Sequence, residues 1–250
     1  MRSIRRKSVM LASLLTITLI ITGCNPNEDA TINETDPTTE TPFTITHDGT
    51  TYGIVTSPYT GKVWLDKNLG ATQVCTALDD VACYGDYYQF GRNFDGHQES
   101  NSTVVTVLAT DVNNAGSNFI SGISGDWVAT GVDDNGSLRE SNWIKADGTS
   151  VCPSGYRLPT LDELSLETIN SADGMTNQVD AFTNFLKLPA AGSKSSQDGL
   201  MQSEGVDTDV WTSTPNASFT RNFTLYISDL QAASAERDRA NAYSVRCIEN

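Results

Sequence analysis

A cysteine, two prolines and a helix start lie within residues 152–164, which read Cys152-Pro153-Ser154-Gly155-Tyr156-Arg157-Leu158-Pro159-Thr160-Leu161-Asp162-Glu163-Leu164. Proline cannot sit in a helix interior, and it biases the residue before it toward an extended conformation. Thr160 followed by Glu163 is the capping-box pattern, in which two side chains satisfy N–H groups at a helix start. The stretch therefore predicts an extended segment that turns into a helix beginning at Leu161.

The predicted helix has an acidic first turn and one core-facing side. Asp162 and Glu163 occupy the first turn, where the helix dipole favours negative charge. At helical spacing, the core-facing side collects Leu161, Leu164, Thr168 and Ile169.

The same stretch resembles the central signature of the Fibrobacter succinogenes major paralogous domain, a family of envelope proteins of unassigned activity. Further segments resemble this family in the same order: 56–71 (TSPYTGKVWLDKNLGA), 84–92 (YGDYYQFGR), 95–98 (DGHQ), 186–192 (LKLPAAG), 211–214 (WTST) and 245–247 (VRC). The resemblance implies a C-type-lectin-like architecture, which is also seen in sulfatase-modifying-factor domains. It implies no reaction.

Composition favours one acidic, exported domain. The chain has 250 residues, 38% of them hydrophobic, which is enough for one sizeable core. Its net charge is −15, and the part after residue 23 carries −19, because the first 23 residues hold only the basic side chains Arg2, Arg5, Arg6 and Lys7. Such a charge repels nucleic acid, so no nucleic-acid partner is expected. Solubility outside the cell explains the acidity; the alternative is an acidic surface that binds calcium or another cation.

The N-terminus predicts export and a lipid anchor. Four basic residues precede an apolar run, 9–21, that is too short to span a membrane comfortably. The run ends in Ile21-Thr22-Gly23-Cys24, which resembles a bacterial lipobox, so residues 1–23 are predicted to be a lipoprotein signal peptide and Cys24 the lipidated residue. The alternative is an ordinary signal peptide that contains a cysteine. Asn25 resembles the outer-membrane sorting pattern, so we expect a location in the cell envelope, at the outer membrane or cell surface.

Residues 24–42 are rich in acidic residues, threonine and proline, and Ile32 is their only bulky apolar side chain. They cannot bury enough surface to offset the entropy of ordering, which predicts a disordered tether. Residues 43–250 are then the globular domain.

The globular domain is predicted to be α+β, with two helices, antiparallel strands and long irregular loops. Asp48-Gly49 predicts a hairpin turn. Residues 177–188 predict the second helix, with Val179 among the side chains that face inward. Alternating patterns near the C-terminus predict strands, and residues 232–240 are interpreted as a solvated connector between two of them.

The cysteines predict two disulfides. With Cys24 acylated, four cysteines remain in an oxidising compartment, and four cysteines allow three pairings. The short separation and the turn-forming Asp79-Asp80 favour a local Cys75–Cys83 bridge, which leaves Cys152 for Cys247.

Ligand binding is expected in the loop-rich region 94–149, since long irregular loops are uncommon unless they are functional. The candidate ligand-binding aromatic residues are Trp127, Trp143 and Tyr87, with aromatic packing in the core as the alternative. An oxygen-rich run offers a weaker candidate for calcium, although it lacks EF-hand spacing and turn chemistry explains it equally well; its candidate ligands are Asp133, Asp134, Asn135 and Glu140. No other cofactor is expected.

No hydrolase, nucleotide or zinc-protease motif is present in the sequence, and a structural hydrogen-bonding role is predicted for His97. The sugar-coordinating tripeptides of calcium-dependent lectins are also absent. We therefore expect a lipid-anchored envelope protein with a non-catalytic, lectin-like binding or adhesion domain, whose partner is a polysaccharide or an extracellular protein. The alternatives are a glycan hydrolase, whose carboxylate pair would depend on three-dimensional separation, and a structural surface protein.

Overall fold

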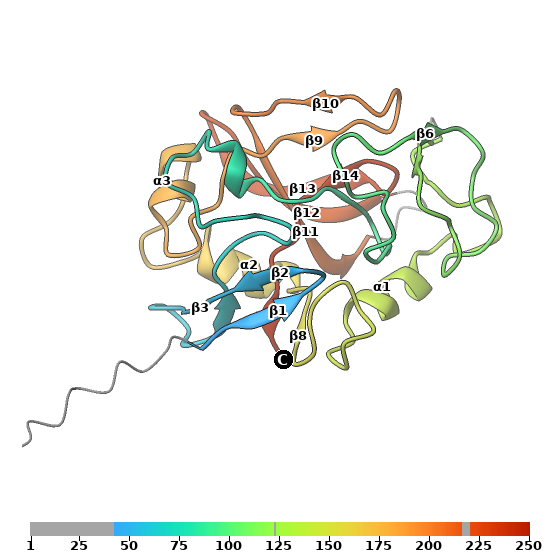
Figure 1. Cartoon of the computed structure of the whole chain (residues 1–250). Helices are drawn as coiled ribbons and strands as arrows, with labels where there is room; N and C mark the ends of the chain where they lie inside the picture. Colours follow the sequence, from blue (N-terminus) through green and yellow to red (C-terminus); the bar gives the residue numbers. More distant parts are fainter. Residues whose placement is uncertain (1–42, 123, 217–220) are drawn as a thin grey trace, which may run out of the picture. The chain divides into compact units, whose positions relative to one another are not determined.

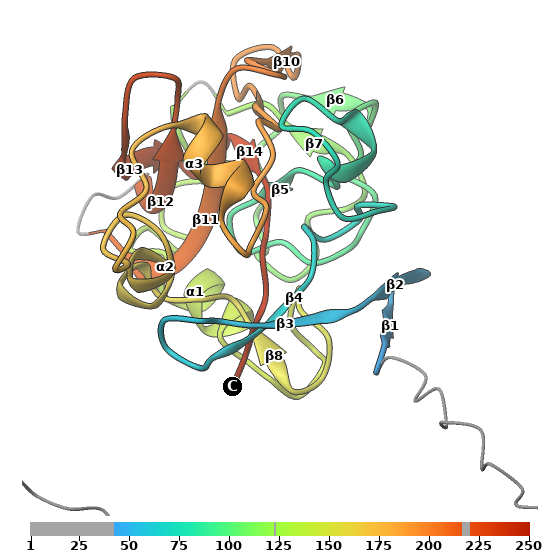
Figure 2. The same cartoon turned by 90° about the vertical axis from the view of Figure 1, so that its left-hand side faces the viewer.

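Short antiparallel strands and three short α-helices make up the part of the chain that the computed structural model describes, residues 43–122, 124–216 and 221–250 (Figures 1 and 2). The predictions for the signal peptide, Cys24 and the tether lie outside these residues. The helices are α1 (Ser137–Trp143), α2 (Leu161–Glu167), α3 (Gln178–Thr183) and the 3-10 helix η1 (Val81–Cys83). The strands are β1 (Ile45–His47), β2 (Thr50–Tyr52), β3 (Ile54–Thr56), β4 (Val63–Leu65), β5 (Tyr88–Gln89), β6 (Val104–Val105), β7 (Phe119–Ile120), β8 (Tyr156–Arg157), β9 (Ser193–Lys194), β10 (Met201–Gln202), β11 (Thr208–Pro215), β12 (Arg221–Ile227), β13 (Ala232–Asp238), β14 (Ala242–Tyr243) and β15 (Ile248–Glu249).

The strands form several small sheets. β11, β12 and β13 make a three-stranded antiparallel sheet, and β3-β4-β15-β8 and β10-β9-β14-β5 are four-stranded. β1 pairs with β2, and β6 pairs with β7 in parallel. In the β3-β4-β15-β8 sheet, the last strand, β15, lies between β4 and β8, so it joins a strand near the start of the domain to residues 156–157. The described part is therefore mixed α+β, as predicted.

The capping box is confirmed at the start of α2. The Thr160 hydroxyl accepts a hydrogen bond from the Glu163 N–H at 3.2 Å, and the Glu163 carboxylate accepts from the Thr160 N–H at 2.9 Å. Arg157 forms a two-point contact with the same carboxylate, at 2.8 and 2.7 Å. These hydrogen bonds lower the pKa of Glu163 to about 2, chiefly through Arg157. The helix start is thus held by the extended segment before it.

The predicted hairpin is also confirmed. β1 and β2 are joined by Asp48 and Gly49, whose φ angles are 45° and 78°. Positive φ at both central residues defines the turn that matches strand twist, and the Asp-Gly pair tolerates it. The hairpin is blue in Figure 1.

Two aromatic and aliphatic clusters form most of the core. In the first, Phe90 lies 5.0 Å from Trp143 and 5.4 Å from Trp211 between ring centroids, and Trp211 lies 4.9 Å from Tyr243. In the second, α2 and α3 pack on β11 and β12 through apolar side chains that include Leu164, Ala181, Val210, Leu225 and Ile227. Long-range packing therefore fixes the ends of many short elements.

Three expectations about secondary structure are wrong in detail. α1 lies in the region predicted to be irregular loop, and two N–H groups of its first turn, at Leu138 and Arg139, donate to the Asp133 carboxylate at 3.0 and 3.2 Å. α3 ends at Thr183, and Val179 is 60% exposed because the inward face is set by Gln178 and Ala181.

The third correction concerns residues 232–240, which were expected to be a connector. Most of this segment is β13, which pairs with β12 along its whole length. Charged residues are compatible with this strand because it is at the edge of its sheet.

Candidate functional site

The aromatic side chains predicted to bind a ligand are instead part of the core. Trp127 and Trp143 are each 0% exposed, and Tyr87 is 2% exposed. Each side chain donates its polar hydrogen to a backbone carbonyl: Trp127 to Phe90 at 2.9 Å, Trp143 to Arg92 at 3.1 Å, and Tyr87 to Ala191 at 2.7 Å. The prediction of an exposed ligand platform at these residues is wrong. Aromatic packing, the alternative, explains them because both indoles fasten loops to the residues around Phe90.

The oxygen-rich run that was a candidate for calcium serves turns and a helix start. The Asp133 carboxylate accepts from Arg139 Nε at 2.9 Å, Asp134 accepts from the Gly131 N–H at 2.7 Å, and Asn135 accepts from the Ser137 N–H at 3.1 Å. Glu140 lies one turn into α1. In the described part of the chain, no group of three or more His, Cys, Asp or Glu side chains is arranged to hold a metal ion. These contacts support the turn interpretation of the run.

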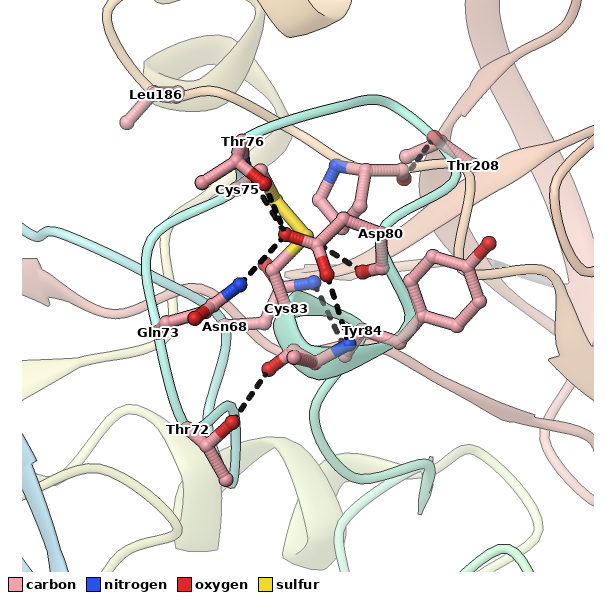
Figure 3. The surroundings of a disulfide bond; sticks show 12 residues. Asn68, Thr72, Gln73, Cys75, Thr76, Asp80, Cys83, Tyr84, Leu186 and Thr208 are labelled. Carbon is pink, nitrogen blue, oxygen red and sulfur yellow. Dashed lines mark hydrogen bonds between the residues drawn. A yellow bond between two sulfur atoms is a disulfide. The ribbon is translucent and has the colours of Figure 1, made fainter.

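Both predicted disulfides are confirmed. Cys75 pairs with Cys83, with a Cα–Cα distance of 5.0 Å, and Cys152 pairs with Cys247 at 6.0 Å. Figure 3 shows the loop closed by the first bridge, in which the Asp80 carboxylate accepts hydrogen bonds from Thr76 and Gln73. These hydrogen bonds lower the pKa of Asp80. The second bridge joins the segment before α2 to the residue before β15.

His97 has the structural role predicted for it. Its Nε2 accepts from the Gln89 N–H at 3.0 Å, so the ring proton is on Nδ1, which donates to the Asp95 carboxylate. The side chain is 0% exposed, and burial lowers the pKa of His97 to about 4. A neutral, fully hydrogen-bonded imidazole fixes the turn formed by residues 95–98.

That turn holds Gln98 in one orientation. The Gln98 side-chain oxygen accepts from the N–H groups of Gly96 at 2.8 Å and Asp95 at 3.3 Å. The oxygen and nitrogen of the amide are thereby distinguished, because only the oxygen can accept from two N–H donors. Gln98 is 0% exposed, and its Nε2 has no hydrogen-bond partner among the described residues. A buried donor without a partner is costly, so its presence needs an explanation.

The Gln98 side chain lines a cavity of about 210 Å³ between the β1–β2 hairpin and the segment that contains β5. We call it the hairpin pocket. Its lining residues are His47, Asp48, Thr50, Tyr52, Gly70, Asp86, Tyr88, Phe94, Gln98 and Glu99.

Asp86 is the most perturbed carboxylate of the hairpin pocket. Burial raises its pKa from 3.8 to about 6. The hydrogen bond from the Tyr88 hydroxyl, 3.4 Å away, opposes this, and the charges of Glu99 and Asp48 add smaller upward contributions. Gly70 is essential beside it, because a Cβ at that position would lie 2.3 Å from the carboxyl carbon of Asp86. The Gly70 φ of 77° also requires glycine. The backbone thus makes room for a carboxylate that receives little hydrogen-bond stabilisation within the free protein.

Phe94 supplies an apolar surface to the same pocket. It is 47% exposed, although most other large aromatic side chains of the domain are buried. An exposed aromatic ring beside hydrogen-bonding groups is the usual composition of a binding site for a partly apolar ligand.

Two other hollows in the described part of the chain lack this combination. One of about 410 Å³ lies beside the start of α2, but its Arg157 is already bound by the Glu163 carboxylate. Another of about 140 Å³ contains Tyr59, whose hydroxyl donates to Asp173 at 2.7 Å, and Asp180, which accepts from Thr176. The hairpin pocket is therefore the candidate site.

Sequence reasoning missed Asp86 and Phe94 as functional residues. Asp86 lies within a segment that carries the family resemblance, but the sequence does not reveal that the hairpin faces it. The available signal is the placement of polar residues among the aromatic ones in residues 84–98, which could equally be structural.

No protein-family model, curated protein or solved structure matches the chain. The resemblance to the Fibrobacter family stays a prediction. Within the residues that the structure describes, no helix has the length and apolar character needed to cross a membrane.

Proposed function

We propose that this chain is a lipid-anchored envelope protein whose globular domain binds a saccharide in the hairpin pocket. The anchor and location rest on the N-terminal sequence that ends at Cys24. The α+β architecture is compatible with the C-type-lectin-like fold implied by the family resemblance, and we propose that finer assignment as well.

One observation carries the binding proposal: the hairpin pocket places the Asp86 carboxylate beside the exposed ring of Phe94. Saccharides offer hydroxyl groups that both donate and accept, together with apolar ring faces. A hydroxyl hydrogen can be donated to Asp86, and the ring face can lie on Phe94. The cavity is smaller than the roughly 300–1,000 Å³ of pockets that enclose drug-sized ligands, so it is expected to take one sugar ring.

A glycan array probed with the full chain in mild detergent tests this function. The wild-type chain is expected to retain a subset of glycans, and Phe94→Ala is expected to lose them. Leu230→Ala is the matched control, because Leu230 is 93% exposed and does not line the pocket. Retention of the same glycans by Phe94→Ala would place the binding elsewhere, and no retained glycan with the wild-type chain would contradict saccharide binding.

One observation also favours glycan hydrolysis as a second candidate. The raised pKa of Asp86, about 6, suits a general acid, and Glu99 and Asp48 in the same pocket could supply the second carboxylate. Release of reducing ends from a bound glycan, abolished by Asp86→Asn, would establish this activity. Binding without release would leave the binding function alone.

A further inference from the structure

Ser102 and Lys194 form a hydrogen-bonded pair that does not belong to the lining of the hairpin pocket. Lys194 Nζ lies 2.6 Å from the Ser102 hydroxyl oxygen, although the two residues are 92 positions apart in the chain. Ser102 closes a turn through its N–H, which donates to the Glu99 carbonyl at 3.0 Å, and Lys194 lies in β9. A serine hydroxyl held against a lysine amine is the arrangement of nucleophile and base in serine–lysine hydrolases, which are recognised by geometry and not by sequence order.

Lys194 has the surroundings of a general base. It is 0% exposed, and the Phe119 ring lies 4.8 Å from Nζ. Its remaining hydrogen bonds go to the backbone carbonyls of Glu99 at 3.1 Å and Ser102 at 3.3 Å, which are neutral oxygens. Burial lowers the pKa of Lys194 from 10.5 to about 8, and the charge of Glu99 opposes this shift. A lysine with such a pKa can give up its proton near neutral pH and then accept another.

The three oxygens around Nζ also match the needs of a neutral amine, which has two N–H donors and one lone pair. The two backbone carbonyls can accept from the donors, and the lone pair can accept from the Ser102 hydroxyl, the closest of the three oxygens. While Lys194 is protonated, the hydroxyl donates to the His97 carbonyl at 2.8 Å instead. Deprotonation of Lys194 therefore requires only a rotation of the hydroxyl hydrogen to align nucleophile and base.

The nucleophile is open to a substrate. Ser102 is half-buried, and its neighbours Asn101 and Thr103 are exposed. The Thr103 N–H has no hydrogen-bond partner among the described residues, so it can donate to an oxyanion that forms beside Ser102. Neither the hairpin pocket nor the two other hollows described above includes Ser102, which favours an ester whose acyl group is small enough to bind at an open surface.

We propose that Ser102 and Lys194 are the nucleophile and the general base of a hydrolase for short-chain acyl esters. The Ser102 oxygen attacks the ester carbonyl carbon while its proton passes to Lys194 Nζ. The bond from that carbon to the alcohol oxygen then breaks, and the leaving alcohol takes the proton. Water attacks the acyl-serine with the help of the same base, releases the carboxylic acid and restores both residues. This activity does not depend on saccharide binding in the hairpin pocket.

A fluorophosphonate probe tests the nucleophile directly, because an activated serine displaces its fluoride and forms a stable oxygen–phosphorus bond. The full chain in mild detergent is expected to carry the label on Ser102, as located by mass spectrometry of the digest. Ser102→Ala is expected to reduce labelling at least about 100-fold, the typical contribution of a positioned base to an activated nucleophile. Ser100→Ala removes an exposed hydroxyl from the same turn and is expected to leave labelling unchanged.

The base is tested by Lys194→Met, which keeps a long side chain at the buried position and removes the amine. A variant that urea denaturation shows to be folded is expected to label at least about 100-fold more slowly. In the wild-type chain, the labelling rate is expected to rise about tenfold per pH unit up to about pH 8 and then level off, because only neutral Lys194 accepts the proton. The titratable groups that face this amine are Glu99 and His97, and His97 stays neutral over this range because burial lowers its pKa to about 4.

Hydrolysis itself is measured with p-nitrophenyl acetate. The wild-type chain is expected to release p-nitrophenol over many turnovers, and Ser102→Ala is expected to lose at least about 100-fold of the rate. Absence of label on Ser102 in the wild-type chain, or equal label on Ser100, would overturn the proposal without the use of any variant. Undiminished labelling of a folded Lys194→Met variant would overturn the role of the base, and label on Ser102 without turnover of the ester would overturn the hydrolase.

Discussion

Asp86→Asn is expected to stabilise the protein in the absence of ligand. Burial raises the Asp86 pKa from 3.8 to about 6, so the folded state holds a proton more tightly than the unfolded state does. The charged carboxylate therefore destabilises the folded state at pH values above about 6. The shift corresponds to an upper limit of roughly 3 kcal/mol above about pH 6, since one pKa unit is worth about 1.4 kcal/mol.

The upward shift of the Asp86 pKa predicts a distinctive pH dependence of the protein's stability. The folded pKa of an acid is raised here, so wild-type stability falls as pH rises from 3.8 through about 6. The gain from Asp86→Asn should be largest near neutral pH, should be about half as large near pH 5, and should vanish below the ordinary pKa of the carboxyl. The groups that face this carboxyl from neighbouring elements are His47, Asp48, Glu99 and the hydroxyls of the tyrosines at 52 and 88.

Urea denaturation of the full chain across this pH range measures the effect. Asp229→Asn is the control for the general benefit of removing one negative charge from an acidic protein, and it should give little change at any pH. A destabilised Asp86→Asn variant, or one that matches Asp229→Asn at neutral pH, would show that the carboxylate is adequately stabilised within the free protein. The argument that burial leaves the charged Asp86 carboxylate poorly stabilised would then lose its support.

Three further predictions concern the scaffold and the anchor. Replacing both Cys152 and Cys247 by alanine should lower the free energy of unfolding by about 4–5 kcal/mol, the chain-entropy value for a loop of this size. Replacing both cysteines of the local disulfide should cost less than about 3 kcal/mol, because that loop is much shorter. Denaturant titration compares the two variants, and equal losses would contradict this reasoning. Thr160→Ala should cost about 1 kcal/mol by loss of the helix cap, and an unchanged denaturation midpoint would count against it. Cys24→Ala should abolish incorporation of a fatty-acid analogue during metabolic labelling, and undiminished label would rule out lipidation at this residue.

Local rules explain which features could be predicted from the sequence. The cap at Thr160 and the turn at Asp48 depend on side chains within a few residues, and both are confirmed. The disulfide pairing followed from a short separation and from elimination, which required no knowledge of the remaining fold.

The candidate site could not be predicted in the same way, because it depends on distant segments meeting. Trp127 and Trp143 lie in a polar, glycine-rich region, and only the fold shows that their indoles bond to carbonyls in the core. Asp86 and Phe94 become a site only because the β1–β2 hairpin lies against them. Whether a residue belongs to the core or contacts a ligand therefore depends on the tertiary structure.

The central claim is that the hairpin pocket is where this protein holds its ligand. A crystal structure of the protein with a saccharide that the glycan array retains measures this directly. The account predicts a sugar ring on Phe94 and a hydroxyl group at the Asp86 carboxylate. The saccharide bound at another surface, with the hairpin pocket unchanged, would contradict it.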